Sequence, residues 1–265
     1  MIKMILSNAE RCLYDNSPLT ETICQIKFPP ILTIGAKEPV EFQEAVRGDF
    51  PRYAQLKEQA APRIVGAGTP NARFETPEPT VNYQFISADG LWKVNLTRTF
   101  IAISTLRYQG WEDFAKRLDK LLMHFIGIYK PAFFERIGLR YINAVSRKKL
   151  DLEDTPWSEL INPAYIGVLD EEDVREKAVA KCSTDVEMLI PGGCRLRLHA
   201  GPGIIQRPQS DKEVRFIIDQ DVSFAGNIAM EHTAGTLSSL HLNAQRVFRG
   251  AITDRLHEAL GPHEV

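Results

Sequence analysis

Hydrophobic and polar residues alternate along four segments of the first half of the chain, and this period of two predicts β-strands. The predicted strands are residues 22–28, 81–85, 92–96 and 100–108. Pro29 and Pro30 end the first strand, because proline has no N–H to donate to a strand ladder. Asp89-Gly90 lies between the second and third strands, and this pair suits the positive φ angles of a tight type I′ turn. We therefore expect a hairpin there.

Apolar residues then recur at helical spacing, which predicts a long amphipathic helix over residues 111–129. Its apolar stripe consists of Trp111, Phe114, Leu118, Leu121, Leu122, Phe125 and Tyr129. An earlier helix is expected from about residue 40 to 58, interrupted or split by Pro51. Residues 60–79 are rich in Pro, Gly, Ala and Thr and predict a long surface loop.

The second half of the chain repeats this order of elements. Strands are predicted over residues 136–145, 185–190, 195–199 and 213–224, a short helix over 157–161 and a long helix over 237–256. Pro191-Gly192-Gly193 takes the place of the earlier Asp-Gly turn, and Gly261-Pro262 ends the last helix. Each half therefore reads as strand, helix, three antiparallel strands and helix. The likeness lies in pattern and not in residue identity, so coincidence is the alternative.

These elements predict a two-layer α+β fold in which pseudo-duplicated βαβββα halves form one curved antiparallel sheet, with the long helices packed on one face. We expect an N-terminal lobe over residues 1–132 and a C-terminal lobe over 133–265, sharing the sheet as one compact unit. The strand face toward the helices must be apolar, because it forms the core. The opposite face is therefore open and polar.

Composition adds only broad limits. The chain has 265 residues, 44% hydrophobic and 25% charged, and a formal net charge of -2, all ordinary for a globular protein. This balance gives no general attraction to nucleic acid or to an anionic membrane, although a local basic patch stays open. The first apolar residues end at Ser7, and no apolar run reaches the roughly 20 residues of a membrane span. We expect a cytoplasmic protein.

The cysteines and histidines give little sign of a metal site. The four cysteines are Cys12, Cys24, Cys182 and Cys194. Because they form no Cys-x-x-Cys pair, free thiols are the favoured interpretation, ahead of a disulfide or a bound metal. His124, His241 and His257 fall at polar positions of predicted helices, which predicts solvated side chains.

Period-two counting gives the residues of the open sheet face directly. They are Asn82, Gln84, Lys93, Asn95, Arg136, Arg140, Asp185, Glu187, Arg195, Arg197, Arg215 and Asp219. Arg136 and Arg140 are four residues apart on one strand, and Gly138 between them has no side chain to obstruct an approaching ligand. Guanidinium groups grip carboxylate or phosphate with two parallel hydrogen bonds. This strand is therefore the candidate platform for binding.

Two interpretations of the open face are kept. In the first, its arginines pair with acidic residues of neighbouring strands and keep an exposed sheet soluble. The arginines concerned are Arg136, Arg140, Arg195, Arg197 and Arg215, and the acids are Asp185, Glu187 and Asp219. In the second, a concave polar surface binds an anionic small molecule or an acidic partner. The predicted ligand- or partner-binding residues are Arg136, Arg140, Asn143, Arg195, Arg197 and Asn95.

Catalytic motifs are missing from the sequence: it has no Walker loop, no strand-linked G-x-G-x-x-G, no G-x-S-x-G and no H-E-x-x-H. Gly66-Ala67-Gly68 lacks a third glycine, which argues against a phosphate cradle. The acidic run 170–173 could coordinate a hard cation, but a solvated loop or first helical turn is favoured. Trp92, Tyr83 and Phe85 could stack nucleic-acid bases, but counting places them on the helix-facing side as core.

The stretch R-I-G-L-R-Y-I-N at 136–143, with Pro18-Leu19-Thr20-Glu21 and the Tyr108-x-x-Trp111-x-x-Phe114 spacing, resembles an uncharacterised prokaryotic family of sporadic distribution and of about this length. The likeness extends over most of the chain, and R-I-G-L-R-Y-I-N is its most specific part. It implies no activity, cofactor or catalytic residue. Sporadic distribution is typical of mobile or defence-linked genes, so the resemblance implies a partner-dependent role in such a locus.

Together these observations predict a non-enzymatic binding or accessory protein that engages an acidic partner or an anionic ligand on the exposed sheet face. We expect no cofactor and no metal; the partner is a protein or an anionic small molecule, and a homodimer stays open. No membrane is expected as a partner, and nucleic acid is not expected because the basic side chains would first have to merge into one stripe. The alternative is a small-molecule hydrolase or transferase acting on a phosphate-bearing substrate, with the same arginines as an anion clamp.

Overall fold

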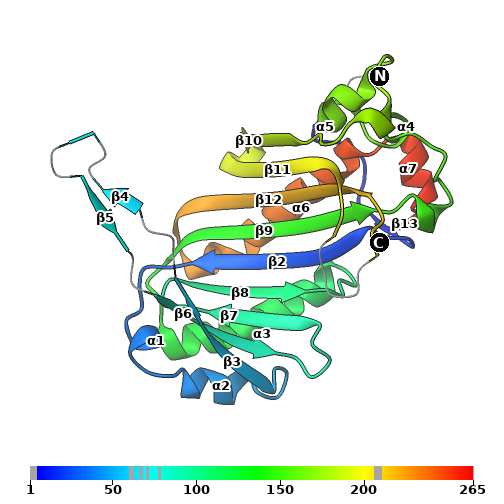
Figure 1. Ribbon diagram of the computed structural model, residues 1–265. Coiled ribbons are helices and arrows are strands. Elements are labelled where there is room, and N and C mark those ends of the chain that lie inside the picture. Colours follow the sequence, from blue (N-terminus) through cyan, green and yellow to red (C-terminus); the bar gives the residue numbers. More distant parts are fainter. Residues whose placement is uncertain are drawn as a thin grey trace.

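A nine-stranded antiparallel sheet forms the centre of the protein (Figure 1). The computed structural model describes residues 5–59, 63–65, 68–69, 72–76, 79–205 and 211–264. The strands of the sheet are β2 (Leu19–Lys27), β3 (Arg52–Glu58), β6 (Thr80–Ile86), β7 (Trp92–Leu96), β8 (Phe100–Thr105), β9 (Phe134–Val145), β10 (Thr184–Ile190), β11 (Cys194–Gly203) and β12 (Arg215–Ile228). Their order is β10-β11-β12-β9-β2-β8-β7-β6-β3. The strands β9 and β2 therefore meet at the centre as neighbours.

Helices and shorter elements surround this sheet. The α-helices are α1 (Thr33–Ala36), α2 (Val40–Val46), α3 (Trp111–Tyr129), α4 (Trp157–Leu160), α5 (Pro163–Ile166), α6 (Thr233–Ala251) and α7 (Asp254–Ala259). The short 3-10 helices are η1 (Lys148–Leu150), η2 (Gly167–Asp170), η3 (Glu176–Ala178), η4 (Pro191–Gly193) and η5 (Met230–His232). Two further strand pairs are β1 (Cys12–Tyr14) with β13 (Pro262–Glu264), and β4 (Arg63–Val65) with β5 (Arg73–Glu75).

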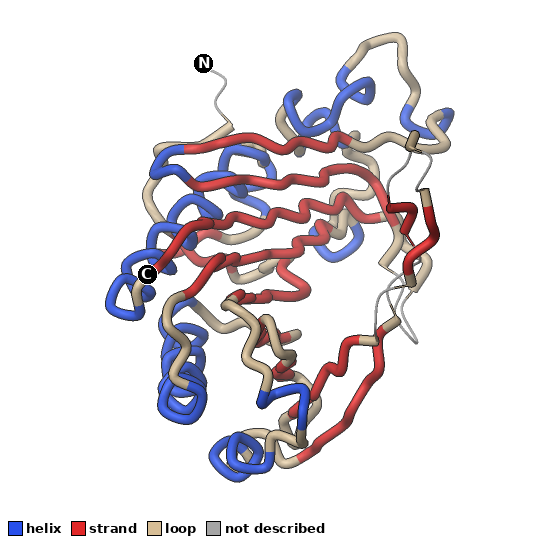
Figure 2. Tube along the Cα trace, turned by 90° about the vertical axis from the view of Figure 1, so that its left-hand side faces the viewer, coloured by secondary structure: helices blue, strands red, loops and turns tan. Residues whose placement is uncertain are grey.

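Helices α3 and α6 lie on the same side of the sheet (Figures 1 and 2). Phe114 of α3 stacks on Trp92 of β7 with ring centroids 5.7 Å apart, and the ring centroids of Phe125 and Phe28 lie 4.8 Å apart. Helix α6 packs on β9 and β12 through residues that include the buried Leu240. Each such buried Leu or Phe side chain contributes about 1.5–3 kcal/mol. The core therefore lies between this helical layer and the sheet.

A segment near the start of the described chain pairs with its last strand. Strand β1 pairs antiparallel with β13, so that Leu13 faces His263 in the ladder. Tyr14 Oη lies 2.9 Å from His257 Nδ1 of α7. These contacts hold the segment before β2 against the C-terminal helices. No helix in the described part of the chain is long and apolar enough to cross a membrane.

Several predicted elements are confirmed. The fold is α+β with a large antiparallel sheet, and the long helix covers 111–129 as expected. Trp92, Tyr83 and Phe85 are buried core residues. The four cysteines are free thiols. The Asp89-Gly90 hairpin joins β6 to β7, but its turn is not type I′.

In that turn only Gly90 has a positive φ, of 74°. Its N–H donates to the Ser87 carbonyl at 3.0 Å, as in a type I turn followed by a left-handed glycine. Asp89 keeps a negative φ, since its carboxylate accepts hydrogen bonds from Ser87 Oγ at 2.6 Å and from the Leu91 N–H at 3.0 Å. The dipeptide therefore identified the hairpin but not the turn type.

Two predictions in the first half are wrong. The helix expected from residue 40 to 58 ends at Val46, and residues 52–58 form the edge strand β3. The ladder to β6, in which Tyr53 pairs with Phe85, overrides the helical pattern of that segment. The expected loop 60–79 contains the paired strands β4 and β5. Gly66-Ala67-Gly68, considered as a phosphate cradle, lies outside the described residues except for Gly68.

Candidate functional site

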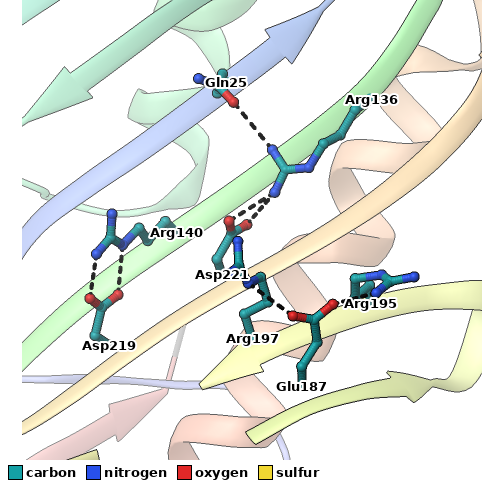
Figure 3. Close-up of polar contacts among 8 residues, drawn as sticks. All are labelled: Gln25, Arg136, Arg140, Glu187, Arg195, Arg197, Asp219 and Asp221. Atoms are coloured by element: carbon teal, nitrogen blue, oxygen red, sulfur yellow. Dashed lines mark hydrogen bonds and ion pairs between the residues drawn. The ribbon is translucent and has the colours of Figure 1, made fainter. Parts of the chain in front are cut away.

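The arginines of the open sheet face are bound by carboxylates (Figure 3). Arg136 Nη2 donates to both carboxylate oxygens of Asp221 at 2.8 and 2.9 Å, and its Nη1 reaches Gln25 Oε1 at 3.4 Å. Arg140 grips Asp219 with two hydrogen bonds of 2.7 and 2.5 Å. Each pair joins β9 to β12. The forked guanidinium geometry expected for a ligand is therefore used on partners within the protein.

The same pairing continues onto β10 and β11. Glu187 accepts from Arg195 and lies 3.3 Å from Arg197 Nε. His199 Nδ1 lies 2.7 Å from Asp185 Oδ1. Cross-strand pairing on this face is thus confirmed, with Asp221 as an additional acid that the sequence did not indicate.

Arg215 was expected to pair across the sheet, and this is wrong. It binds Asp211 at 2.8 Å and Glu213 at 3.0 Å, just before it in the sequence. These acids reach its guanidinium first because β12 begins there.

The open face also has a hollow of about 460 Å³, and the carboxylates around it disfavour an anion. Its charged lining consists of Arg140, Arg197, His199, Asp185, Glu187, Asp219 and Asp221. Four carboxylates therefore face two guanidiniums and one imidazole. An incoming anion would have to compete with carboxylates that already hold the arginines.

The predicted site residues do not gather in one place. Arg136, Arg140, Arg195 and Arg197 share the open face of β9 and β11. Asn95 is on β7, three strands from β9, where its Oδ1 accepts from Gln84 Nε2 at 3.0 Å. Asn143 was placed in the same site, and this grouping is wrong because it lies an odd number of residues from Arg140.

Asn143 instead points to the helix side of the sheet, where it is 5% exposed. It lines a cavity of about 230 Å³ between α6, the strands β9 and β12, and the segment before β2. Tyr108, Tyr141, Gln220 and His241 also line this cavity. Tyr141, Asn143, Gln220 and His241 are all buried, and because four buried polar side chains line one cavity we take it as the candidate site.

A chain of three side chains forms the inner wall of the cavity. Tyr108 Oη lies 3.5 Å from Tyr141 Oη, which lies 2.8 Å from His241 Nδ1. The His241 ring stacks on Trp111 with centroids 4.3 Å apart and an interplanar angle of 6°. Helix α6 thus carries the histidine, and the N-terminus of α3 fixes its plane.

Burial keeps both members of the shorter contact neutral. Desolvation lowers the pKa of His241 to about 3, with a further contribution from the cation of Arg11. Desolvation also raises the pKa of Tyr141 well above its ordinary value. A neutral imidazole carries one proton, on either Nδ1 or Nε2.

The position of the ring proton sets the direction of the Tyr141–His241 hydrogen bond. When the proton is on Nε2, the Tyr141 hydroxyl donates to Nδ1; when it is on Nδ1, the Tyr141 oxygen accepts from it and the hydroxyl can donate to Tyr108.

Four buried polar atoms of the cavity lining have no hydrogen-bond partner in the described part of the chain. They are Arg11 Nε, Gln220 Oε1, His241 Nε2 and Arg249 Nε. Gln220 is 1% exposed and His241 6%. Buried polar groups are normally paired, and leaving one unpaired costs about 1–3 kcal/mol. These four atoms are buried within the cavity lining.

Three arginines, Arg11, Arg246 and Arg249, line the cavity. Arg249 already donates to Asp254, with Nη2 2.5 Å from Oδ1. The two terminal nitrogens of Arg11 donate to the carboxylate of Glu112 at 2.6 and 2.9 Å, and its Nε has no partner among the described residues. Arg246 Nε binds the Ser7 carbonyl at 3.0 Å and has no carboxylate partner among the described residues. Of the three arginines, Arg246 is thus the one whose charge no carboxylate among the described residues offsets.

The sequence did indicate this site in part. On the core-facing side of β12, Phe216, Ile218 and Val222 are apolar and Gln220 is polar. A polar residue among the apolar residues of one strand face indicates a buried polar side chain. His241, predicted to be solvated, is buried, and that prediction is wrong. Residue 241 follows Leu237 by four positions and so lies in the apolar stripe of α6.

The fold and the cavity define an α+β protein with a single large sheet and a partly polar cavity beneath α6. No protein-family model matches the chain, and no curated protein matches it. Among the described residues, no group of three or more His, Cys, Asp and Glu is arranged to hold a metal ion.

Proposed function

We propose that this protein is a non-enzymatic binding protein that takes a small anionic molecule into the cavity beneath α6. One observation carries the proposal: the guanidinium of Arg246 lines a cavity of about 230 Å³ and pairs with no carboxylate among the described residues. An anionic ligand would supply the missing counter-charge. Charge-assisted hydrogen bonds of this kind are about twice as strong as neutral ones.

The state of the inner wall supports binding over catalysis. A general acid or base works best with a pKa near the working pH. Burial moves the pKa of His241 to about 3 and that of Tyr141 far upward, so neither exchanges a proton near neutrality. The hydrolase or transferase alternative stays a prediction with no proton-transferring group assigned in this cavity.

An acidic partner on the open sheet face stays the second proposal. The arginines of this face would have to give up their ion pairs with Asp219, Asp221 and Glu187 to bind the partner, so the net binding free energy would be small. A cytoplasmic setting and a mobile or defence-linked locus also stay proposals.

We also propose that the two halves arose by duplication. The order β6-β7-β8-β2 in one half corresponds to β10-β11-β12-β9 in the other, and in each half the last strand pairs with the first. The halves join where β2 pairs with β9. A pseudo-twofold axis between these two strands accounts for both orders.

A blocked-cavity variant tests the binding proposal. Gln245→Trp places a large side chain in the half-buried mouth lining of α6, and Ser239→Trp adds the same side chain at an exposed position of that helix. Benzoate, inorganic phosphate and neutral benzyl alcohol are titrated by calorimetry and thermal shift. At 100 times its Kd a ligand stabilises the fold by about 2.7 kcal/mol.

We expect at least one of the two anions to bind the native protein and Ser239→Trp, and to bind Gln245→Trp at least tenfold more weakly. Benzyl alcohol should bind more weakly than benzoate. Equal binding to both tryptophan variants, binding of the alcohol as tight as that of the anions, or no binding of either anion would overturn the proposal.

A further inference from the structure

We infer that the edge strand β3 joins two copies of this chain, by pairing antiparallel with β3 of a second copy about a twofold axis at Gln55. The inference goes beyond the proposed function, because β3 is the last strand of the sheet and lies five strands from β9, which lines the cavity. Three properties of β3 lead to it: a free backbone edge, exposed apolar side chains and a sequence that complements itself.

The hydrogen bonds of the neighbouring strand β6 show which way the backbone of β3 points. Alternate residues of an antiparallel strand direct both N–H and C=O to the same neighbour. The Ser87 N–H donates to the Trp92 carbonyl at 3.0 Å, and this pair continues the β6–β7 register in which Tyr83 is opposite Leu96. Odd-numbered residues of β6 therefore bond to β7, and even-numbered residues bond to β3.

The outer edge of β3 is consequently free. Ala54 is opposite Gln84 in the β3–β6 register, so the even-numbered residues of β3 bond to β6. Tyr53, Gln55 and Lys57 direct their N–H and C=O groups away from the sheet, and these groups have no backbone hydrogen-bond partner among the described residues. Such a row of unpaired groups is a template for another strand.

The strand lacks two common protections of a sheet edge, which are proline and a β-bulge. Residues 52–58, R-Y-A-Q-L-K-E, contain no proline, and their register with β6 has no shift. Tyr53 is 41% exposed and Leu56 46%, and they lie on opposite faces of the strand. A second strand would therefore cover apolar surface on each face.

The order of residues in β3 favours a second copy of β3 as that strand. Antiparallel pairing about Gln55 sets Arg52 opposite Glu58, Tyr53 opposite Lys57 and Ala54 opposite Leu56. A basic residue then meets an acidic one at each end, and no like charges are opposite each other. An aromatic ring beside an ammonium group adds about 0.5–1 kcal/mol at an exposed site. All outward-directed residues also meet outward-directed residues, since they are all odd-numbered.

The strand at the other edge of the sheet, β10, does not complement itself in this way. Its central residue is Glu187, so pairing with a second copy about that residue sets the carboxylate opposite itself. Pairing about Val186 sets Asp185 opposite Glu187. Like charges directly opposite each other destabilise a strand pair. Self-association is therefore expected at β3 and not at β10.

The oligomeric state of the native full chain is the first test. One strand pair is smaller than the roughly 1,200–2,000 Å² of a stable interface, so we expect a reversible dimer that forms between about 10 µM and 1 mM. Sedimentation velocity over this range of concentration measures it.

Charge variants at the axis test the register. Gln55→Glu and Gln55→Lys each set like charges opposite each other, and each variant alone should dimerise at least about fivefold more weakly than the native chain. An equimolar mixture of the two should recover the dimer, because opposite charges then meet. The same two substitutions at Gln109, exposed in the segment before α3, are the control and should leave dimerisation unchanged.

Amide hydrogen exchange in the native chain tests the same edge without a variant. The outward amides of Tyr53, Gln55 and Lys57 should exchange at least about fivefold more slowly at the highest concentration than at the lowest. The amides of Ala54 and Leu56, which bond to β6, should change little.

A native chain that stays monomeric at about 1 mM would overturn the inference. A dimer that both Gln55 variants form as readily as the native chain would overturn it as well, and so would a loss that the mixture does not reverse. If the Gln55 variants fail to fold, the exchange of the three outward amides decides: slowing with concentration supports the β3 pair, and unchanged exchange in a dimer rejects it.

Discussion

The guanidinium of Arg136 lies over Gly138, two residues further along β9, so that a Cβ added at residue 138 would collide with the Arg136 terminal nitrogens and come 2.8 Å from Cζ. The space that glycine leaves is therefore occupied by the chain's own arginine and not by a ligand. This position holds Arg136 against Asp221 and Gln25. The R-x-G spacing thus has a local structural reason.

Gly138→Ala should displace the Arg136 guanidinium and weaken its contacts with Asp221 and Gln25. Because the colliding atoms are the far end of a flexible side chain, the expected loss is modest, about 1 kcal/mol in the free energy of unfolding. In an Arg136→Met background the same change should cost almost nothing. Urea unfolding of the four proteins measures the coupling, and an equal cost of Gly138→Ala in both backgrounds would contradict the relationship.

The buried histidine predicts a specific dependence of stability on pH. The folded-state pKa of His241 is about 3, below its ordinary value of 6.5, so the unfolded chain binds a proton more readily. Stability from this residue is fully present above about pH 6.5 and is lost as the pH falls toward 3. Between pH 6.5 and 4.5 the loss amounts to at most about 2.7 kcal/mol.

His241→Phe keeps an aromatic ring against Trp111 but removes the titrating group. The variant should be less stable than the native protein at pH 7, because Tyr141 loses its hydrogen-bond partner. Between pH 7 and pH 4.5 the variant should lose less free energy of unfolding than the native protein does, by up to about 2.7 kcal/mol. The measurement is urea unfolding at both pH values, and an identical pH-dependent loss in the two proteins would show that His241 is not buried as a neutral ring.

Two glycines predict opposite effects of the same substitution. A Cβ on Gly201 of β11 would collide with the Cys182 carbonyl oxygen and lie 3.1 Å from the Ser183 Cα, both backbone atoms that cannot easily move. Gly201→Ala should therefore cost about 1–3 kcal/mol. A Cβ on Gly127 of α3 would meet no atom within 4 Å, so Gly127→Ala should stabilise by up to about 1 kcal/mol. Thermal unfolding of both variants distinguishes these signs.

The two arginines of β9 should differ in their coupling to β12. The Arg140 side chain is 45% exposed and that of its partner Asp219 is 19% exposed; because the guanidinium is half in solvent, a double-mutant cycle should give less than about 1 kcal/mol. Arg136 and Asp221 are 22% and 26% exposed and share a further contact with Gln25, which predicts a larger coupling. Alanine variants of each residue and pair test this order. A larger coupling for the Arg140 pair would show that exposure does not control these bonds.

The kinds of element along the chain could be predicted because they depend on local patterns. Helical spacing from Trp111 to Tyr129 predicts α3 to the residue, and alternation predicts that Trp92 faces the core while Arg140 faces out. Strand β3 could not be predicted in this way, since it exists through its ladder to β6. The edge of the sheet, not the local pattern, decides its conformation.

The amino-acid sequence by itself determined which side chains each strand presents to either face, because successive side chains of a strand alternate regardless of its neighbours. Only the tertiary structure decided what those side chains meet. Asp219 and Asp221 reach the arginines because β12 pairs with β9, and Tyr141, Gln220 and His241 share a cavity because α6 crosses that pair of strands. Contacts between segments far apart in the chain follow from the order of strands in the sheet, which no local period contains.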